Sequence, residues 1–185
     1  SPGLAMAALT DAKIRSILLT SGTLSPLGSF AQELTVPFDI RLENAHVIDP
    51  SPVFVAVVAK GPRGYALNSS YQSRNRPEYK EDLGNAIVNF ARIVPDGLLV
   101  FFPSYGVLKQ CTEAWRSAGT GGLCIWDRIS QYKAPVVEPR DTAMFPAATA
   151  DFTAKLDNPA YKGAIFFAVC RGKASEGLDF SDRAG

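Results

Sequence analysis

Short apolar runs alternate with amphipathic segments along most of the chain, and this pattern predicts its secondary structure. Apolar runs predict buried strands at residues 16–20, 53–58, 97–102, 134–138 and 164–170. Helical spacing of apolar positions predicts helices at residues 26–34, from Pro77 onward, and at 107–118, 125–131 and 147–156. Buried strands that alternate with amphipathic helices indicate an α/β fold, a parallel sheet with helices on both faces.

The composition supports one globular chain and excludes several other classes. Of the 185 residues, 46% are hydrophobic and 20% charged, and the net charge is +1, so no overall field attracts nucleic acid or a membrane. The apolar runs are far shorter than the ~20 residues that span a bilayer. Three cysteines and one histidine are too scattered for a disulfide framework or a zinc site, so we expect no metal ligands. Both termini look abrupt, and we expect the chain to be part of a longer protein.

Two polar loops follow predicted strands, where α/β sheets bind ligands because helix N-termini present free N–H groups there. The first contains Ser21, Gly22 and Thr23, and the second contains Ser104 and Tyr105. The hydroxyl and N–H groups of the second loop could hold a phosphate. In the first loop the hydroxyl residues could equally serve helix capping and turns. In the second loop the favoured role of Ser104 is the helix N-cap, which is compatible with phosphate binding.

The loop that follows the predicted strand at residues 164–170 has the most informative composition. It contains Arg171, Gly172 and Lys173, followed by Glu176, Gly177 and Asp179. Glycines allow close approach of a ligand, the cations can neutralise phosphates, and the carboxylates can accept hydrogen bonds from hydroxyl or arginine groups. An ion-paired surface loop is the alternative.

Residues 60–80 form a separate basic segment that also carries tyrosines. Its cations are Lys60, Arg63, Arg74, Arg76 and Lys80. They alternate with Tyr65, Tyr71 and Tyr79. Cations beside aromatic rings suit single-stranded DNA or a protein partner, and a solvated loop is the alternative.

In order and spacing, the three loops resemble one family. Residues 18–26 (LLTSGTLSP) look like motif III, residues 101–105 (FFPSY) like motif IV, and residues 169–182 (VCRGKASEGLDFSD) like motif V of the iron–sulfur, DEAH-box superfamily 2 DNA helicases. This family includes the xeroderma pigmentosum group D and Fanconi anaemia group J helicases. Residues 42–49 and 137–140 resemble its telomere-maintenance branch, and residues 85–105 look most like plant members.

The resemblance implies a RecA-like second motor domain of an ATP-dependent 5′-to-3′ DNA helicase in the nucleus, acting in telomere maintenance, DNA repair and recombination control. Residues 1–30 would end the first motor domain, and residues 31–185 would form the second, truncated before motif VI. ATP and Mg²⁺ would be shared with the missing first domain. A 4Fe–4S cluster would belong to the full-length protein and not to this chain.

The resemblance also implies roles for individual residues. Coupling between nucleotide and DNA would involve Ser21, Gly22 and Thr23. Contacts with DNA would come from Ser104, Tyr105, Arg171, Gly172 and Lys173. One wall of the ATP cleft would be formed by Glu176, Gly177 and Asp179. The chain contains no GxxxxGK[ST] phosphate loop, so we expect it to be inactive when isolated. The alternative function is a non-catalytic RecA-like module that binds DNA or protein.

Overall fold

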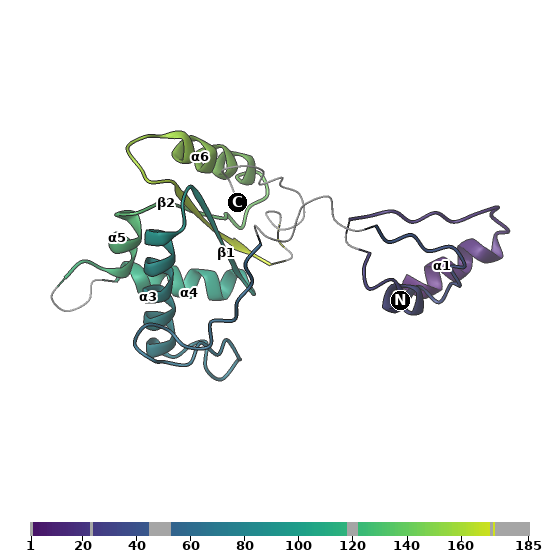
Figure 1. Ribbon diagram of the computed structural model, residues 1–185, viewed down its shortest axis with the longest axis horizontal. Coiled ribbons are helices and arrows are strands. Elements are labelled where there is room, and N and C mark those ends of the chain that lie inside the picture. Colours follow the sequence, from purple (N-terminus) through teal and green to yellow (C-terminus); the bar gives the residue numbers. More distant parts are fainter. Residues whose placement is uncertain (1, 23, 45–52, 118–121, 171, 173–185) are drawn as a thin grey trace. The chain divides into compact units, whose positions relative to one another are not determined.

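A computed structural model describes residues 2–22, 24–44, 53–117, 122–170 and 172. The chain divides into two compact units, Ser1–Val55 and Ala56–Gly185, and each is described by itself (Figure 1). The predicted assignment of residues 1–30 and 31–185 to two motor domains stays a prediction.

The described residues of the first unit form the helices α1 (Pro2–Asp11) and α2 (Leu27–Leu34). The two helices are in contact, and the hydroxyl of Thr35, just after α2, donates a hydrogen bond of 3.4 Å to the carbonyl oxygen of Gly3. The helix predicted at residues 26–34 is confirmed by α2. Helix α1 was not predicted, because its apolar residues do not gather on one face.

Two strand predictions are wrong. Residues 16–20 and 53–58 have no regular secondary structure, and Leu18, Phe54 and Val57 are 85%, 90% and 93% exposed. Apolar and β-branched residues favour an extended backbone, but a strand also needs a neighbouring strand that accepts its hydrogen bonds. Neither run has such a neighbour among the described residues.

The second unit has an α/β fold, as predicted. Its elements are α3 (Pro77–Ile93), β1 (Gly97–Phe102), α4 (Tyr105–Arg116), α5 (Ile125–Ser130), β2 (Ala134–Val137), α6 (Phe145–Asp157) and β3 (Ala164–Val169). All of them were predicted to within a few residues. The strands form a parallel three-stranded sheet in the order β1-β3-β2.

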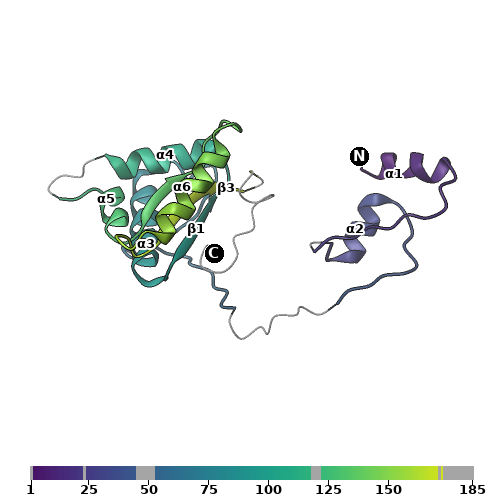
Figure 2. The ribbon, with the colours of Figure 1, turned by 90° about the horizontal axis from the view of Figure 1, so that it is seen from above.

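The side chains of β3 alternate between two hydrophobic layers. Ile165, Phe167 and Val169 pack with α3, α4 and α5, and the ring centroids of Phe167 and Trp115 lie 5.9 Å apart. On the other face, Phe166 packs edge-on against Phe152 of α6 at 5.4 Å. Figure 2 shows α6 lying over the strands. Helices therefore cover both faces of the sheet.

A buried lysine connects the strands at the amino-terminal edge of the sheet. The Nζ of Lys133, just before β2, donates hydrogen bonds to the carbonyl oxygens of Asp96 (2.6 Å) and Lys162 (3.3 Å), which precede β1 and β3. Burial lowers the pKa of Lys133, and the charge of Asp96 partly opposes this shift. Lys133 thus holds the starts of the strands together.

Helix α3 packs closely against α4 and α5 through a glycine. A Cβ atom at Gly84 would lie 2.5 Å from Nε1 of Trp115 and 2.8 Å from Cγ2 of Ile125. The same indole nitrogen donates a 2.7 Å hydrogen bond to the carbonyl oxygen of Lys80. The Trp115 ring is therefore fixed in place and cannot easily move aside.

We predict that Gly84→Ala lowers the melting temperature by several degrees. Replacing glycine by alanine inside a helix stabilises the fold by about 1 kcal/mol. Overpacking a buried contact, however, destabilises the fold by about 1–3 kcal/mol. The matched control is Gly106→Ala in α4, where the new Cβ would have Ser104 Oγ as its nearest neighbour at 3.8 Å. Thermal unfolding followed by circular dichroism compares the two. An equal rise in melting temperature for both variants would contradict this packing.

Candidate nucleic-acid interface

The carboxyl ends of the three parallel strands meet at one edge of the sheet. The register pairs Phe102 with Val169 and Val137 with Phe167. Just past these pairs, the backbone N–H of Cys170 donates to the carbonyl oxygen of Phe102 at 2.8 Å. The loops after β1, β2 and β3 therefore begin side by side, and we call this region the carboxyl edge.

Ser104 caps helix α4 at the carboxyl edge. Its Oγ accepts a hydrogen bond of 3.3 Å from the backbone N–H of Val107, which confirms the capping role. The side chain is partly exposed. A serine hydroxyl has one donor and two acceptor positions, so its hydrogen remains available to donate to a phosphate oxygen.

A buried carboxylate, Glu138, lies between the loops of the carboxyl edge. Glu138 directly follows β2 and is 3% exposed. One carboxylate oxygen accepts a 2.7 Å hydrogen bond from the Tyr105 hydroxyl, and the other accepts a 2.8 Å bond from the backbone N–H of Val169. Sequence reasoning did not select Glu138 as a site residue. The one sequence feature that could have indicated Glu138 is that a charged residue stands at the carboxyl end of a predicted buried strand.

The environment of Tyr105 keeps its hydroxyl protonated. Burial, the hydrogen bond to Glu138 and the negative charge of that carboxylate raise the pKa of Tyr105 to about 12, and Arg140 opposes this in part. Tyr105 is the first residue of α4 and is only partly buried. Its hydroxyl therefore acts as a hydrogen-bond donor to Glu138 over the whole neutral range.

Gly172, in the loop after β3, lies against the same carboxylate. A Cβ at this position would be 2.9 Å from a carboxylate oxygen of Glu138 and 2.8 Å from the carbonyl oxygen of Val169. The Glu138 oxygen is held by its hydrogen bond from Tyr105, and Val169 is held in β3, so a larger residue would require the backbone at Gly172 to shift. The close approach explains why glycine stands between Arg171 and Lys173.

The structure brings three of the predicted site residues together: Ser104, Tyr105 and Gly172. Ser21 and Gly22 lie in the first unit, whereas these three residues lie in the second. The remaining predicted residues fall outside the described part of the chain: Thr23, Arg171, Lys173, Glu176, Gly177 and Asp179.

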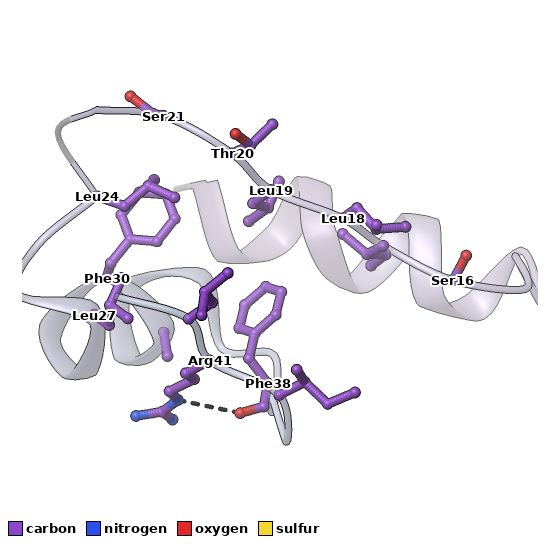
Figure 3. Close-up of a pocket in the computed structure, with 14 residues that line it drawn as sticks. Ser16, Leu18, Leu19, Thr20, Ser21, Leu24, Leu27, Phe30, Phe38 and Arg41 are labelled. Carbon is purple, nitrogen blue, oxygen red and sulfur yellow. Dashed lines mark hydrogen bonds between the residues drawn. The ribbon is translucent and has the colours of Figure 1, made fainter. Parts of the chain in front are cut away.

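The loop with Ser21 borders a cavity of about 610 Å³ within the first unit. Its lining is mostly apolar, and Figure 3 shows Leu19, Phe30 and Phe38 gathered around it, with the hydroxyls of Ser16 and Ser21 pointing away. Arg41 also lines the cavity, and its Nε donates a 3.1 Å hydrogen bond to the carbonyl oxygen of Phe38. The cavity is therefore suited to apolar groups.

The basic segment at residues 60–80 is anchored to α3 by Asp82. This buried carboxylate accepts hydrogen bonds from the backbone N–H groups of Arg63 and Tyr65, both at 2.9 Å. The Arg63 side chain forms a salt bridge with Glu81, which offsets its charge.

The tyrosines of this segment differ in exposure. Tyr79 is 4% exposed and lies in the core, so the expectation that its ring is available to a partner is wrong. It is buried because it faces inward from the first turn of α3. Tyr71 is 78% exposed, with the guanidinium of Arg74 at 5.1 Å from its ring centroid.

Two features are absent from the described residues. No group of three His, Cys, Asp or Glu side chains among them is arranged to hold a metal ion. None of the helices described combines the length and the apolar character needed to cross a membrane.

The profile of the family described as "Helicase C-terminal domain" matches residues 87–185, a range that includes the carboxyl edge. The chain belongs to this family. Over its whole length it is also 54% identical to the regulator of telomere elongation helicase 1 homolog of Arabidopsis thaliana and 55% identical to that of Oryza sativa subsp. japonica. The homolog of Culex quinquefasciatus is 49% identical over the same span.

These similarities confirm the predicted resemblance to the regulator of telomere elongation helicase and to its plant members. The chain spans 18% of the Arabidopsis relative and 19% of the rice relative.

We predict that burial of Tyr105 and its hydrogen bond to Glu138 raise the pH at which this tyrosine ionises. Because its folded-state pKa of about 12 lies above the ordinary value of 10.0, Tyr105 contributes stability that is present below pH 10 and is lost as the pH rises through 12. Tyrosinate absorbance of the wild type minus that of Tyr105→Phe should titrate with a midpoint near pH 12. A midpoint near pH 10 would show that Tyr105 is not bonded to Glu138 in solution.

Proposed function

We propose that this chain is part of an ATP-dependent 5′-to-3′ DNA helicase of the nucleus that acts in telomere maintenance, DNA repair and recombination control. In this proposal the chain supplies DNA contacts and one wall of the ATP cleft. The family membership supports a helicase role. The observation that most directly supports the DNA contacts is that Ser104, Tyr105 and Gly172 lie together at the carboxyl edge.

The chemistry of the carboxyl edge suits a nucleic-acid backbone. Helix α4 starts there with its free N–H groups, and the Ser104 hydroxyl has a hydrogen to donate, so both can bind a phosphate. The Tyr105 ring offers a surface on which a base can stack. Arg171 and Lys173 flank Gly172 in sequence and would neutralise phosphates. Together these groups would bind single-stranded DNA without selecting its sequence.

The nucleotide contacts belong to the same proposal. Glu176, Gly177 and Asp179 would face ATP and Mg²⁺, while Ser21, Gly22 and Thr23 would relay the state of the nucleotide to the DNA. The chain has no GxxxxGK[ST] loop to hold the triphosphate, so another domain must supply that part, and the isolated chain should not hydrolyse ATP. A 4Fe–4S cluster would also lie in the rest of the full-length protein.

A second candidate function is a non-catalytic binding module for DNA or protein. The exposed Tyr71, with Arg74 beside its ring, favours a contact through residues 60–80 in either case. ATP hydrolysis by the full-length protein that increases with single-stranded DNA distinguishes a motor from a module.

We predict that Lys173→Ala in the full-length protein weakens single-stranded DNA binding and reduces its salt dependence. Removing one phosphate contact should lower the slope of log affinity against log salt by about 0.7. The matched control is Lys162→Ala, because Lys162 is exposed and precedes β3 at the opposite edge of the sheet. A salt series of fluorescence-anisotropy titrations measures both slopes. Equal slopes for Lys173→Ala and the wild type would contradict a DNA contact after β3.

A further inference from the structure

We infer that Glu138 is a positioning residue that holds Tyr105 and the carboxyl end of β3 in one fixed arrangement for contact with nucleic acid. This inference rests on the proposed function, because it assigns Glu138 a role in the same DNA-binding edge. It adds a residue that is not part of any of the three motif-like loops and that would touch no DNA itself.

The hydrogen bonds of Glu138 join helix α4 and strand β3, whose bonded residues are distant in sequence. One oxygen binds the Tyr105 hydroxyl at 2.7 Å, in the first turn of α4, and the other binds the N–H of Val169 at 2.8 Å, at the end of β3. The backbone N–H of Glu138 itself donates to the carbonyl oxygen of Phe167 at 2.8 Å, which fixes the carboxylate relative to β3. A displacement of the start of α4 or of the end of β3 therefore breaks a bond to the same side chain.

The burial of Glu138 is unfavourable unless its bonds compensate for it. A carboxylate that is 3% exposed has lost most of its hydration, and no salt bridge among the described residues involves it. Its described partners are a hydroxyl and a backbone N–H, both neutral donors. Because an unmade bond here leaves a buried charge unsatisfied, the arrangement of Tyr105 is strongly preferred over alternatives.

A comparison of Glu138 with Lys133 distinguishes a residue that positions a binding group from one that only stabilises the sheet. Both residues are buried charges that flank β2, but the described hydrogen bonds of the Lys133 side chain go to backbone carbonyl oxygens at the amino-terminal edge. Glu138 instead binds the side chain of a residue proposed to contact DNA, and it lies 2.9 Å from where a Cβ of Gly172 would be. Of these two buried charges, it is therefore Glu138 that connects the strand ends to the proposed DNA-binding groups.

The test measures single-stranded DNA affinity of the full-length protein with a fluorescent oligothymidylate. Tyr105→Ala, which removes the ring, should lose about tenfold in affinity, as expected for one stacking contact. Tyr105→Phe and Glu138→Ala should each lose severalfold in affinity. The double variant should lose no more than the single variant with the larger loss, because both substitutions remove the same Tyr105–Glu138 hydrogen bond.

Glu138→Gln should restore near wild-type affinity. A glutamine can accept from the N–H of Val169 with its oxygen and donate to the Tyr105 oxygen with its nitrogen, so both links remain without the charge. Lys133→Met is the control for structural support. It should lower the melting temperature while leaving the affinity of the folded protein unchanged.

Each outcome decides a separate point. Unchanged affinity of Tyr105→Ala would refute the proposed DNA contact at this edge. Loss for Tyr105→Ala together with full affinity for Tyr105→Phe or Glu138→Ala would overturn the positioning role while leaving the contact standing. Independent, multiplying losses in the double variant would overturn it as well. If Glu138→Ala does not fold, the comparison of Tyr105→Phe with Glu138→Gln decides: the inference requires a loss in the first and none in the second.

Discussion

The arrangement of the second unit depends on β3, which hydrogen-bonds to β1 on one side and β2 on the other. All six of its residues are buried, and its alternating side chains enter both hydrophobic layers. Burial of each large side chain such as Phe166 or Phe167 contributes about 2–3 kcal/mol. Because both neighbours run parallel to β3, the carboxyl ends of all three strands must lie at one edge, and the candidate interface follows from this constraint.

Two buried charges of opposite sign flank β2, which has four residues. Lys133 holds the strand starts through carbonyl oxygens, and Glu138 holds the strand ends through an N–H and the Tyr105 hydroxyl. The lysine is a donor and meets backbone carbonyl oxygens next to the strand starts. The carboxylate is an acceptor and meets a backbone N–H at a strand end. The same physical device therefore stabilises one edge and fixes the groups at the other edge, where we propose that DNA binds.

Local sequence patterns predicted most of the second unit, because runs such as residues 97–102 and 164–169 also find partners along the sheet. The same local signal at residues 53–58 failed, since pairing depends on a neighbour that no local pattern can reveal. Ser104 was predicted as a cap from its position alone. Glu138 was missed because its role depends on the register of β2 with β3 and on the distant Tyr105. The burial of Tyr79 likewise depends on the packing of α3.

The central claim is that the carboxyl edge of the sheet binds single-stranded DNA. The most direct measurement is hydrogen–deuterium exchange of the full-length protein with and without DNA. The account predicts slower exchange on binding in the peptides that contain Ser104, Glu138 and Gly172, and unchanged exchange around Asp96 and Lys162 at the opposite edge. Protection at the opposite edge, or none at the carboxyl edge, would contradict the account.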